Sequence, residues 1–270
     1  MIASLDRSER KAEISDRNSM TEKRLEILFR DEHFVAVNKP AGLLVHRSDL
    51  DRHETEFALQ LVRDQIGRHV YPVHRLDRPT SGVLLFALSP EAARRAGEAF
   101  DTDAVRKTYL AVVRGVTETE ARIDYPLQEL PERYETKGSA AQSDAKEALT
   151  SFRRLAMVEL PLPLGNFPTV RYPLLEVRPG SGRRHQIRRH LKHVFHPIIG
   201  DTTYGEGRHN RLFRNELGCS RMLLHAVELA FPHPWNGATV TISAPLDEEF
   251  SGIIRRLGWK GHLPTDWRTR

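Results

Sequence analysis

One carboxylate lies among cationic side chains in the segment His74-Arg75-Leu76-Asp77-Arg78. Three residues that carry or can carry a positive charge, His74, Arg75 and Arg78, lie within three positions of Asp77. Nearby positive charge favours the ionised form of a carboxylate and can also hold a phosphate group. The pattern predicts either a reactive Asp77 acting on an anionic substrate or, more simply, an aspartate that caps a turn.

The sequence around Asp77 limits the classes of enzyme in which it could be catalytic. The continuous apolar run Gly82–Leu88 predicts a buried strand directly after the loop, and such an anchor is a common way to present a reactive group. A kinase catalytic loop would need an Asn further along, a Gly-rich loop and a DFG segment, which are missing. A glycosidase would need two carboxylates flanking the scissile bond. One carboxylate among cations suits a polyanionic substrate better.

The densest basic segment is Gly180–His193, which is almost free of acidic residues. We predict a helix from about Arg184 to Val194, on which Arg184, Arg188 and Lys192 line one face. The apolar stripe that would dock this helix on the core comprises Ile187, Leu191 and Val194. The start at Gly180-Ser181-Gly182 would leave free backbone N–H groups for an anion. An anionic partner explains the unrelieved charge better than a solvated face does.

Three histidines, His185, His190 and His193, raise the possibility of a metal site. Neighbouring arginines would repel a cation, and no HExxH or CxxC pattern accompanies them. We therefore expect no metal.

Composition sets the broader limits. The chain of 270 residues has a formal net charge of +5 and a pI of about 9.5. The single cysteine, Cys219, excludes an intramolecular disulfide. No apolar run approaches the roughly 20 residues needed to cross a bilayer, and charges interrupt the N-terminus from Asp6 onward. We expect a protein of the cytoplasm without a membrane anchor.

The apolar pattern predicts an α+β domain in which helices are separated by antiparallel strands. We expect a disordered polar extension over residues 1–21, the folded domain over 22–270 and an exposed excursion over 128–148. The strands are expected at 25–29, 34–37, 82–88, 107–113, 150–158, 170–177, 222–230 and 239–243. Besides the basic helix, the helices are expected at 56–66, 90–100 and 247–257.

Four segments, taken together, resemble the RluA-type pseudouridine synthases, which isomerise uridine to pseudouridine in RNA. In chain order they are His74–Ala87, Lys107–Gly115, Gly182–Asp201 and Arg221–Ala226. The resemblance implies the fold of that family: a mixed, mainly antiparallel sheet with flanking helices and a central RNA-binding cleft. No S4-like RNA-binding domain is expected before the catalytic domain.

The resemblance also implies catalytic roles. Asp77 would be the nucleophile, either attacking the sugar or abstracting a proton to give a glycal. Arg188 would pair with Asp77 and orient it. Tyr109 would stack on the target uracil and later act as base at C5. No redox change occurs, so no cofactor is expected.

Further side chains are expected to contact RNA. Arg75 would fill the space left when the base is flipped out of its stack, which costs a few kcal/mol. His74 would orient the loop, and Leu223 or Leu224 would pack under the base. The candidates for contacts with RNA phosphates are Arg78, Arg183, Arg184, Arg189 and Lys192.

Three further segments favour a tRNA-modifying branch of the family that acts on uridine 65: Val45–Ser48, Val62–Gly67 and Thr169–Glu176. The partner would then be tRNA. We expect a monomer without an obligate protein partner. Two alternatives remain: a synthase for ribosomal RNA, and a non-catalytic RNA-binding protein on the same fold. The second would be expected to lack the Asp, Tyr or Arg at the active positions, and all three are present.

Overall fold

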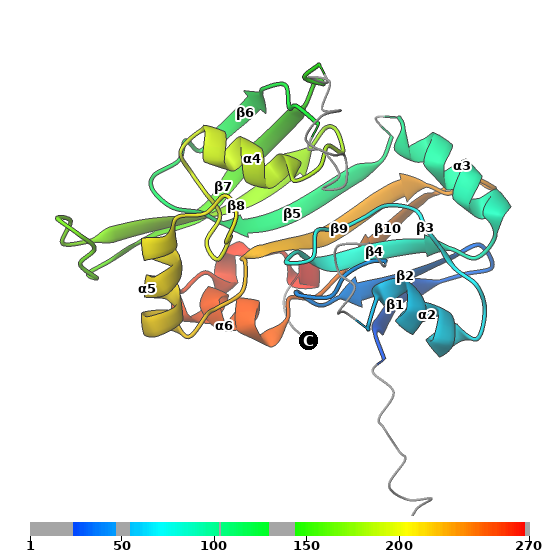
Figure 1. Cartoon of the computed structure of the whole chain (residues 1–270), viewed down its shortest axis with the longest axis horizontal. Helices are drawn as coiled ribbons and strands as arrows, with labels where there is room; N and C mark the ends of the chain where they lie inside the picture. Colours follow the sequence, from blue (N-terminus) through cyan, green and yellow to red (C-terminus); the bar gives the residue numbers. More distant parts are fainter. Residues whose placement is uncertain (1–23, 47–54, 103, 130–143, 268–270) are drawn as a thin grey trace, which may run out of the picture.

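A single ten-stranded sheet connects the described parts of the molecule (Figure 1). The computed structural model describes residues 24–46, 55–102, 104–129 and 144–267. The main path through the sheet is β1-β2-β4-β9-β5-β8-β7-β6, while β3 pairs with β4 and β10 with β9. All pairings between these strands are antiparallel except that of β4 with β9, which is parallel. The mixed, mainly antiparallel sheet predicted from the sequence is confirmed.

The strands are β1 (Glu26–Arg30), β2 (Phe34–Lys39), β3 (Tyr71–Pro72), β4 (Ser81–Ala87), β5 (Arg106–Val112), β6 (Glu120–Asp124), β7 (Leu149–Leu160), β8 (Val170–Pro179), β9 (Leu224–Pro232) and β10 (Thr239–Ser243). The helices are α2 (Ala58–Ile66), α3 (Pro90–Phe100), α4 (Gln186–His193), α5 (Gly207–Leu217) and α6 (Glu248–Arg256), followed by 3-10 turns at Lys260–His262 and Thr265–Trp267.

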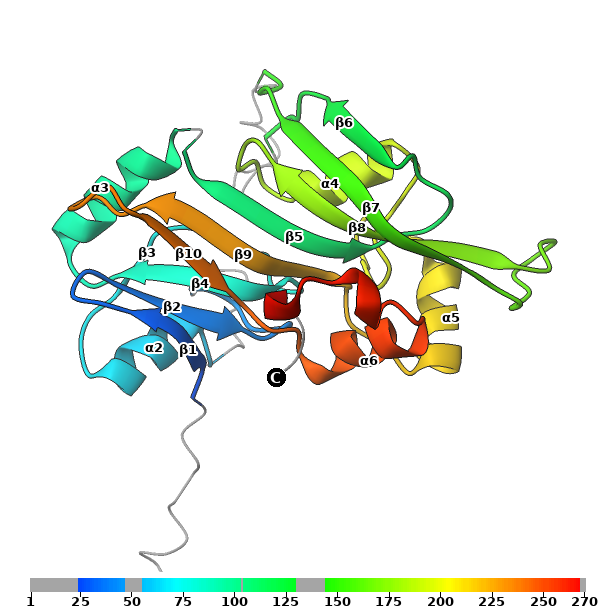
Figure 2. The same ribbon diagram turned by 180° about the vertical axis from the view of Figure 1, so that it is seen from behind.

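Helices cover both faces of the sheet, because successive strand residues point to opposite sides. On β2, for example, Val35 packs with the buried residues of α2, whereas Phe34 packs with those of α3. Helices α2 and α4 lie on the face toward the viewer in Figure 1, and α6 lies on the face toward the viewer in Figure 2. No helix in the described part of the chain is long and apolar enough to cross a membrane.

Most predicted elements are present with small shifts at their ends. Ser89 caps α3 as expected, since its side chain accepts a hydrogen bond from the backbone N–H of Ala92 at 3.1 Å. Gly67 ends α2 in the left-handed conformation. The 1–21 extension lies outside the described residues, as does 130–143 of the expected 128–148 excursion. Helix α5 and strands β3 and β6 were not predicted.

The start of the basic helix is a correction. Helix α4 begins at Gln186, because His185 adopts a left-handed backbone with φ of 56°. Arg184 therefore lies before the helix and does not share a helical face with Arg188 and Lys192. The anion site predicted at Gly180–Gly182 is also wrong, since these glycines precede the helix and Gly180 N donates to Leu149 O at 2.8 Å.

The parallel pairing of β4 with β9 brings two chain segments unusually close where the Asp77 loop ends. Ser81 pairs with His225 and Gly82 with Ala226. Gly82 has φ of 111°, and a Cβ atom added there would lie 2.2 Å from Ala226 O. Only glycine allows this approach.

We predict that Gly82→Ala destabilises the fold by more than about 3 kcal/mol, because backbone strain of 1–3 kcal/mol adds to the clash with Ala226. Urea unfolding measures the change. Gly97→Ala in α3 is the matched control: its Cβ meets nothing within 4 Å, and it should stabilise the helix by about 0.5–1 kcal/mol. Similar stabilities for the two variants would contradict the close approach.

Candidate active site

Buried Lys39 joins the Asp77 loop to the preceding loop. Its Nζ donates to Leu43 O at 2.7 Å, Pro40 O at 3.0 Å and Arg78 O at 3.2 Å. Burial and the nearby charge of Arg221 lower the pKa of Lys39 to about 7. Lys39 was not among the predicted site residues. Its signal in the sequence is a lysine that ends β2, after the apolar run Phe34–Val37 and directly before a proline.

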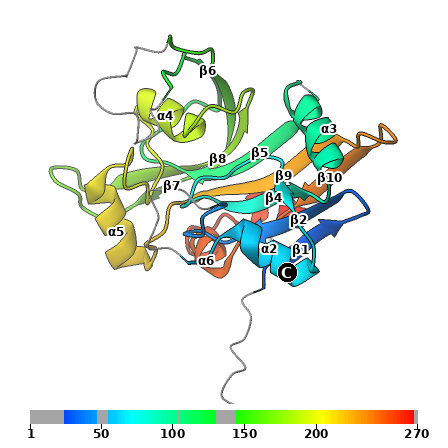
Figure 3. The same ribbon diagram turned by 45° about the vertical axis from the view of Figure 1, so that its right-hand side comes forward.

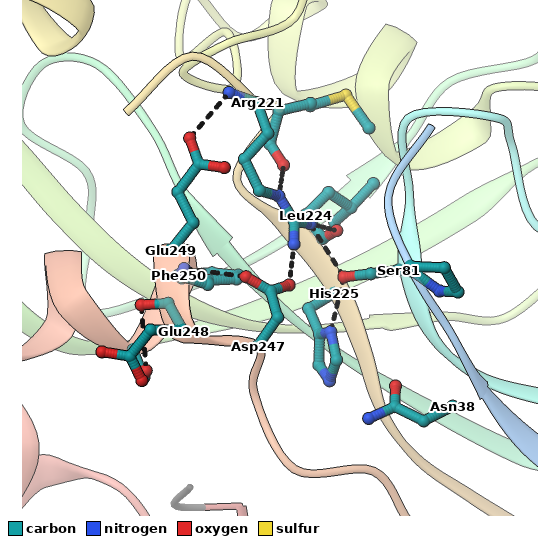
Figure 4. A network of polar contacts seen from close by, with 12 residues as sticks. Asn38, Ser81, Arg221, Leu224, His225, Asp247, Glu248, Glu249 and Phe250 are labelled. Carbon is teal, nitrogen blue, oxygen red and sulfur yellow. Dashed lines mark hydrogen bonds and ion pairs between the residues drawn. The ribbon is translucent and has the colours of Figure 1, made fainter. Parts of the chain in front are cut away.

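A second set of contacts fixes the end of the loop, where Ser81 begins β4 (Figure 4). Arg221 forms an ion pair with Asp247, the residue that caps α6, and donates to Ser81 Oγ at 2.8 Å. Ser81 Oγ lies 2.6 Å from His225 Nδ1, and His225 Nε2 lies 3.3 Å from Ala244 O. Because Ala244 O can only accept, Nε2 carries the proton and Nδ1 accepts from Ser81.

Burial and the charge of Arg221 lower the pKa of His225 to about 4, so the ring is neutral at pH 7, in agreement with this pattern. The network ties the first residue of β4 to β9 and α6. Asp77 therefore lies four residues before Ser81, whose position this network fixes.

Arg188 bridges Asp77 to a second carboxylate. Its Nη1 donates to Asp77 Oδ2 at 2.9 Å, while Nε and Nη2 donate to the two oxygens of Asp201 at 2.7 and 2.9 Å. The Arg188 side chain is 5% exposed, that of Asp201 is 0% exposed and that of Asp77 is 25% exposed. The predicted contact between Arg188 and Asp77 is confirmed, whereas its catalytic purpose stays a prediction.

Asp201 was missed as a partner of Arg188. It also accepts hydrogen bonds from the backbone N–H groups of Thr203 at 2.8 Å and Tyr204 at 2.9 Å. Burial alone would raise the pKa of Asp201, but these hydrogen bonds and that of Arg188 lower it. Asp201 therefore stays ionised and fixes the guanidinium that contacts Asp77.

His185 and Tyr204 complete the surroundings of Asp77. His185 Nε2 lies 3.8 Å from Asp77 Oδ1, and its Nδ1 lies 3.0 Å from the Tyr204 hydroxyl. The ring of Tyr204 lies under the Arg188 guanidinium, 5.0 Å from centroid to Cζ. Burial lowers the pKa of His185, although the charge of Asp77 acts in the opposite direction. The left-handed backbone of His185 is a strained conformation for a residue other than glycine, and it places the ring between Asp77 and Tyr204.

Tyr109 lies on β5 at a bulge in the pairing with β9. It packs against both the α2 cluster, which includes Leu76, and the α4 cluster. Burial and the negative charge of Asp77 raise the pKa of Tyr109. The phenol is therefore neutral at pH 7, and its ring packs in the cluster that contains Leu76, the residue before Asp77.

His74, Arg75 and the two leucines predicted near the target base differ in their surroundings. His74 Nε2 accepts a hydrogen bond from Leu85 N at 3.2 Å, and burial lowers the pKa of His74 to about 3, which fits a residue that orients the loop. The Arg75 side chain is exposed and forms no hydrogen bond or ion pair within the described part of the chain. Leu224 packs in the same cluster as Tyr109. Leu223 is buried in a separate cluster with residues of α5 and α6, so of the two alternatives Leu224 is the one that packs with Tyr109.

The cations proposed for phosphate contacts differ in the contacts that their side chains make within the protein. Arg183 Nε donates to Glu147 O at 3.3 Å, and Arg189 Nη1 donates to Gln128 O at 2.9 Å, so both help to hold the segments on either side of 130–143. Lys192 is exposed, with Nζ 5.8 Å from the Tyr204 ring centroid. Arg78 and Arg184 are exposed. In the described part of the chain, no group of His, Cys, Asp or Glu side chains is arranged to hold a metal ion.

The fold agrees with the comparisons to known proteins. The family model described as RNA pseudouridylate synthase matches residues 33–193, which is more than half of the chain. The chain belongs to this family.

Relatives and solved structures agree with that assignment. The chain is 52% identical to the tRNA pseudouridine synthase C of Vibrio cholerae over 239 residues, covering 88% of this chain and 98% of the relative. It is also 52% identical to the tRNA pseudouridine synthase C of Haemophilus influenzae, covering 87% and 99% of the two chains. Among solved structures, human RNA pseudouridylate synthase domain containing 1 is similar, with 29% identity, a TM-score of 0.63 and coverage of 83% and 84%.

We predict that Asp201→Asn lowers the free energy of unfolding at pH 7 by about 3 kcal/mol, because it leaves buried Arg188 without its full partner. The pKa of Asp201 is lowered in the fold, so the folded chain binds this proton more weakly than the unfolded chain. Its stabilisation is present above the ordinary carboxyl pKa near 4 and is lost as pH falls through the lower, folded value.

Urea unfolding between pH 7 and pH 3 measures both effects, and the variant should lack this part of the acid dependence. Asp64→Asn is the control, since Asp64 pairs with Arg63 at 2.8 Å on the surface, where ion pairs contribute little. An Asp201→Asn curve that parallels the wild type at the same stability would disprove the bridge.

Proposed function

We propose that the protein isomerises uridine to pseudouridine in tRNA, at uridine 65, with Asp77 as the group that starts the reaction. The observation that carries the proposal is the contact of half-buried Asp77 with Arg188, which is itself fixed by Asp201. A carboxylate with one oriented ion pair and one accessible edge suits attack on a sugar carbon, because catalytic groups act best when their geometry is set in advance.

The reaction breaks the bond from ribose C1′ to uracil N1, turns the detached base and forms a bond from C1′ to C5. A hydrogen leaves C5 and N1 gains one, so the product is an isomer and no oxidant or cofactor is needed. Asp77 either attacks C1′ or removes a proton from the sugar to give a glycal. Tyr109, whose ring packs in the cluster that contains Leu76, would stack on the uracil and later serve as base at C5.

The substrate assignment draws on the named relatives, which are tRNA pseudouridine synthases that this chain matches over nearly their whole length. Base flipping is needed because the reacting bonds are hidden in a stacked helix. Arg75, exposed and free of described partners, is suited to occupy the gap. We expect the protein to act as a monomer, without an obligate protein partner, in the cytoplasm where tRNA is found.

Asp77→Asn is predicted to abolish pseudouridine formation while keeping tRNA affinity within about threefold, because the amide retains the shape but not the charge. Release of tritium from transcripts labelled at uridine C5 measures turnover, and filter binding measures affinity. Turnover by the variant would refute the role of Asp77.

The same assay separates the candidate substrates. Wild-type protein should release tritium from a tRNA transcript but not from one with cytidine at position 65, nor from ribosomal RNA fragments. Release from the ribosomal fragments alone would replace the tRNA assignment by the ribosomal one. Binding to RNA without release from any transcript would favour a non-catalytic RNA-binding protein.

A further inference from the structure

A hollow of about 620 Å³ lies away from Asp77, between the loop after β5, the hairpin tip that joins β7 to β8, and the first turn of α5. Figures 1 and 3 show this region, with α5 beneath the projecting ends of β7 and β8 and α4 above them. We call it the Arg114 pocket. The side chains that matter for its chemistry are Arg114, Val116, Phe167, Arg171, Arg208 and His209.

The charge of the Arg114 pocket suits an anion. Three arginines line it, and no acidic residue does. Arg171 and Arg208 each contact a carboxylate outside the lining, at 2.9 Å from Glu159 and 3.1 Å from Glu206. Arg114 has only a long approach of 3.9 Å to Glu206, and its guanidinium makes no hydrogen bond within the described residues. Its planar set of N–H donors therefore remains available to a phosphate.

An exposed aromatic ring stands at the same place. Phe167 is 72% exposed, and Val116, which also lines the pocket, is 49% exposed. An exposed ring alone indicates no site, but this one lies at the edge of a hollow lined by arginines. Proteins that bind single-stranded RNA combine a positively charged groove with aromatic rings on which bases stack. Phe167 beside three arginines is such a combination.

The walls of the pocket are fixed before any ligand arrives. Leu164 and Phe167 exchange backbone hydrogen bonds of 2.9 and 3.3 Å across the hairpin tip, which presents the Phe167 ring on a tight turn. On the other side, His209 joins two elements, with Nδ1 2.8 Å from the Tyr172 hydroxyl and Nε2 3.2 Å from Glu206. A preformed site loses less entropy on binding.

The pocket is also close to the active site along the chain. Tyr204 lies under Arg188, and Arg208 follows four residues later. Because a chain spans at most about 3.6 Å per residue, the Cα atoms of Tyr204 and Arg208 lie within roughly 15 Å of each other. An RNA that contacts Tyr204 beside the active site therefore needs to extend only this far to reach Arg208 in the lining of the Arg114 pocket.

We propose that the Arg114 pocket binds a nucleotide of the substrate RNA other than the target uridine, with its base on Phe167 and its phosphate on Arg114. The site builds on the proposed function, which supplies the RNA. It gives the catalytic domain a second point of attachment, so that the position of the target uridine is set by two contacts at a fixed spacing.

Two variants test the pocket: Arg114→Gln removes the charge, and Phe167→Ala removes the ring. Each should weaken the affinity for full-length tRNA about tenfold, as expected for one phosphate contact or one stacked base. Single-turnover rates at saturating tRNA should stay within twofold of the wild type, because neither side chain reaches Asp77.

The salt dependence separates the two contacts. A plot of log affinity against log salt concentration should become shallower by about one for Arg114→Gln, which loses a phosphate contact. For Phe167→Ala the slope should not change, although affinity falls. This difference cannot arise from a general loss of folding, and thermal unfolding of each variant checks the fold directly.

Matched controls are Phe195→Ala, whose residue is 79% exposed but does not line the pocket, and Arg30→Gln on edge strand β1. Both should bind tRNA as the wild type does. If Arg114→Gln and Phe167→Ala bind within twofold of wild type while wild type modifies tRNA, the pocket is refuted and the proposed function stands. If wild type neither binds nor modifies any RNA tested, both proposals are wrong.

Discussion

The central interaction of this structure is the bridge that Arg188 makes between two carboxylates, Asp201 on one side and Asp77 on the other. Burying a guanidinium is costly unless it is paired, and Asp201 meets that need with two hydrogen bonds. The third donor then contacts Asp77, the more exposed of the two carboxylates. One arginine thereby fixes the position of a reactive group without enclosing it.

The rest of the fold supplies rigid supports for this bridge. The Asp77 loop is held directly after Asp77 by Lys39, which binds Arg78 O, and at its end by the network of Ser81, Arg221 and His225. The close parallel pairing of β4 with β9 fixes the position at which the chain leaves the loop and enters β4. Helix α4 positions Arg188 against Asp77, because buried Ile187 and Leu191 dock the helix on the core. These parts come from distant regions of the chain, and the sheet is what brings them together.

The sequence predicted the strands, the loop and the Arg188 contact well, because apolar periodicity and recognisable segments carry that information. It placed the start of α4 two residues early, because His185 leaves helical geometry to approach Asp77 and Tyr204, a tertiary contact that local propensity does not contain. Asp201 and Lys39 were missed because each is a single polar residue whose contacts depend on how loops fold back, with Asp201 on Arg188 and Lys39 on carbonyl oxygens that include that of Arg78. Leu223 and Leu224 were left as alternatives, and only the direction of their side chains in the sheet separated them.

The most direct test of the account is the single-turnover rate of pseudouridine formation by an Arg188→Lys variant at saturating tRNA. Lysine keeps the charge but lacks the planar fork that reaches both carboxylates at once. The account predicts a rate at least about a hundredfold below wild type with tRNA still bound, because small displacements of a catalytic group have effects of this size. A rate within about threefold of wild type would contradict the claim that Arg188 positions Asp77.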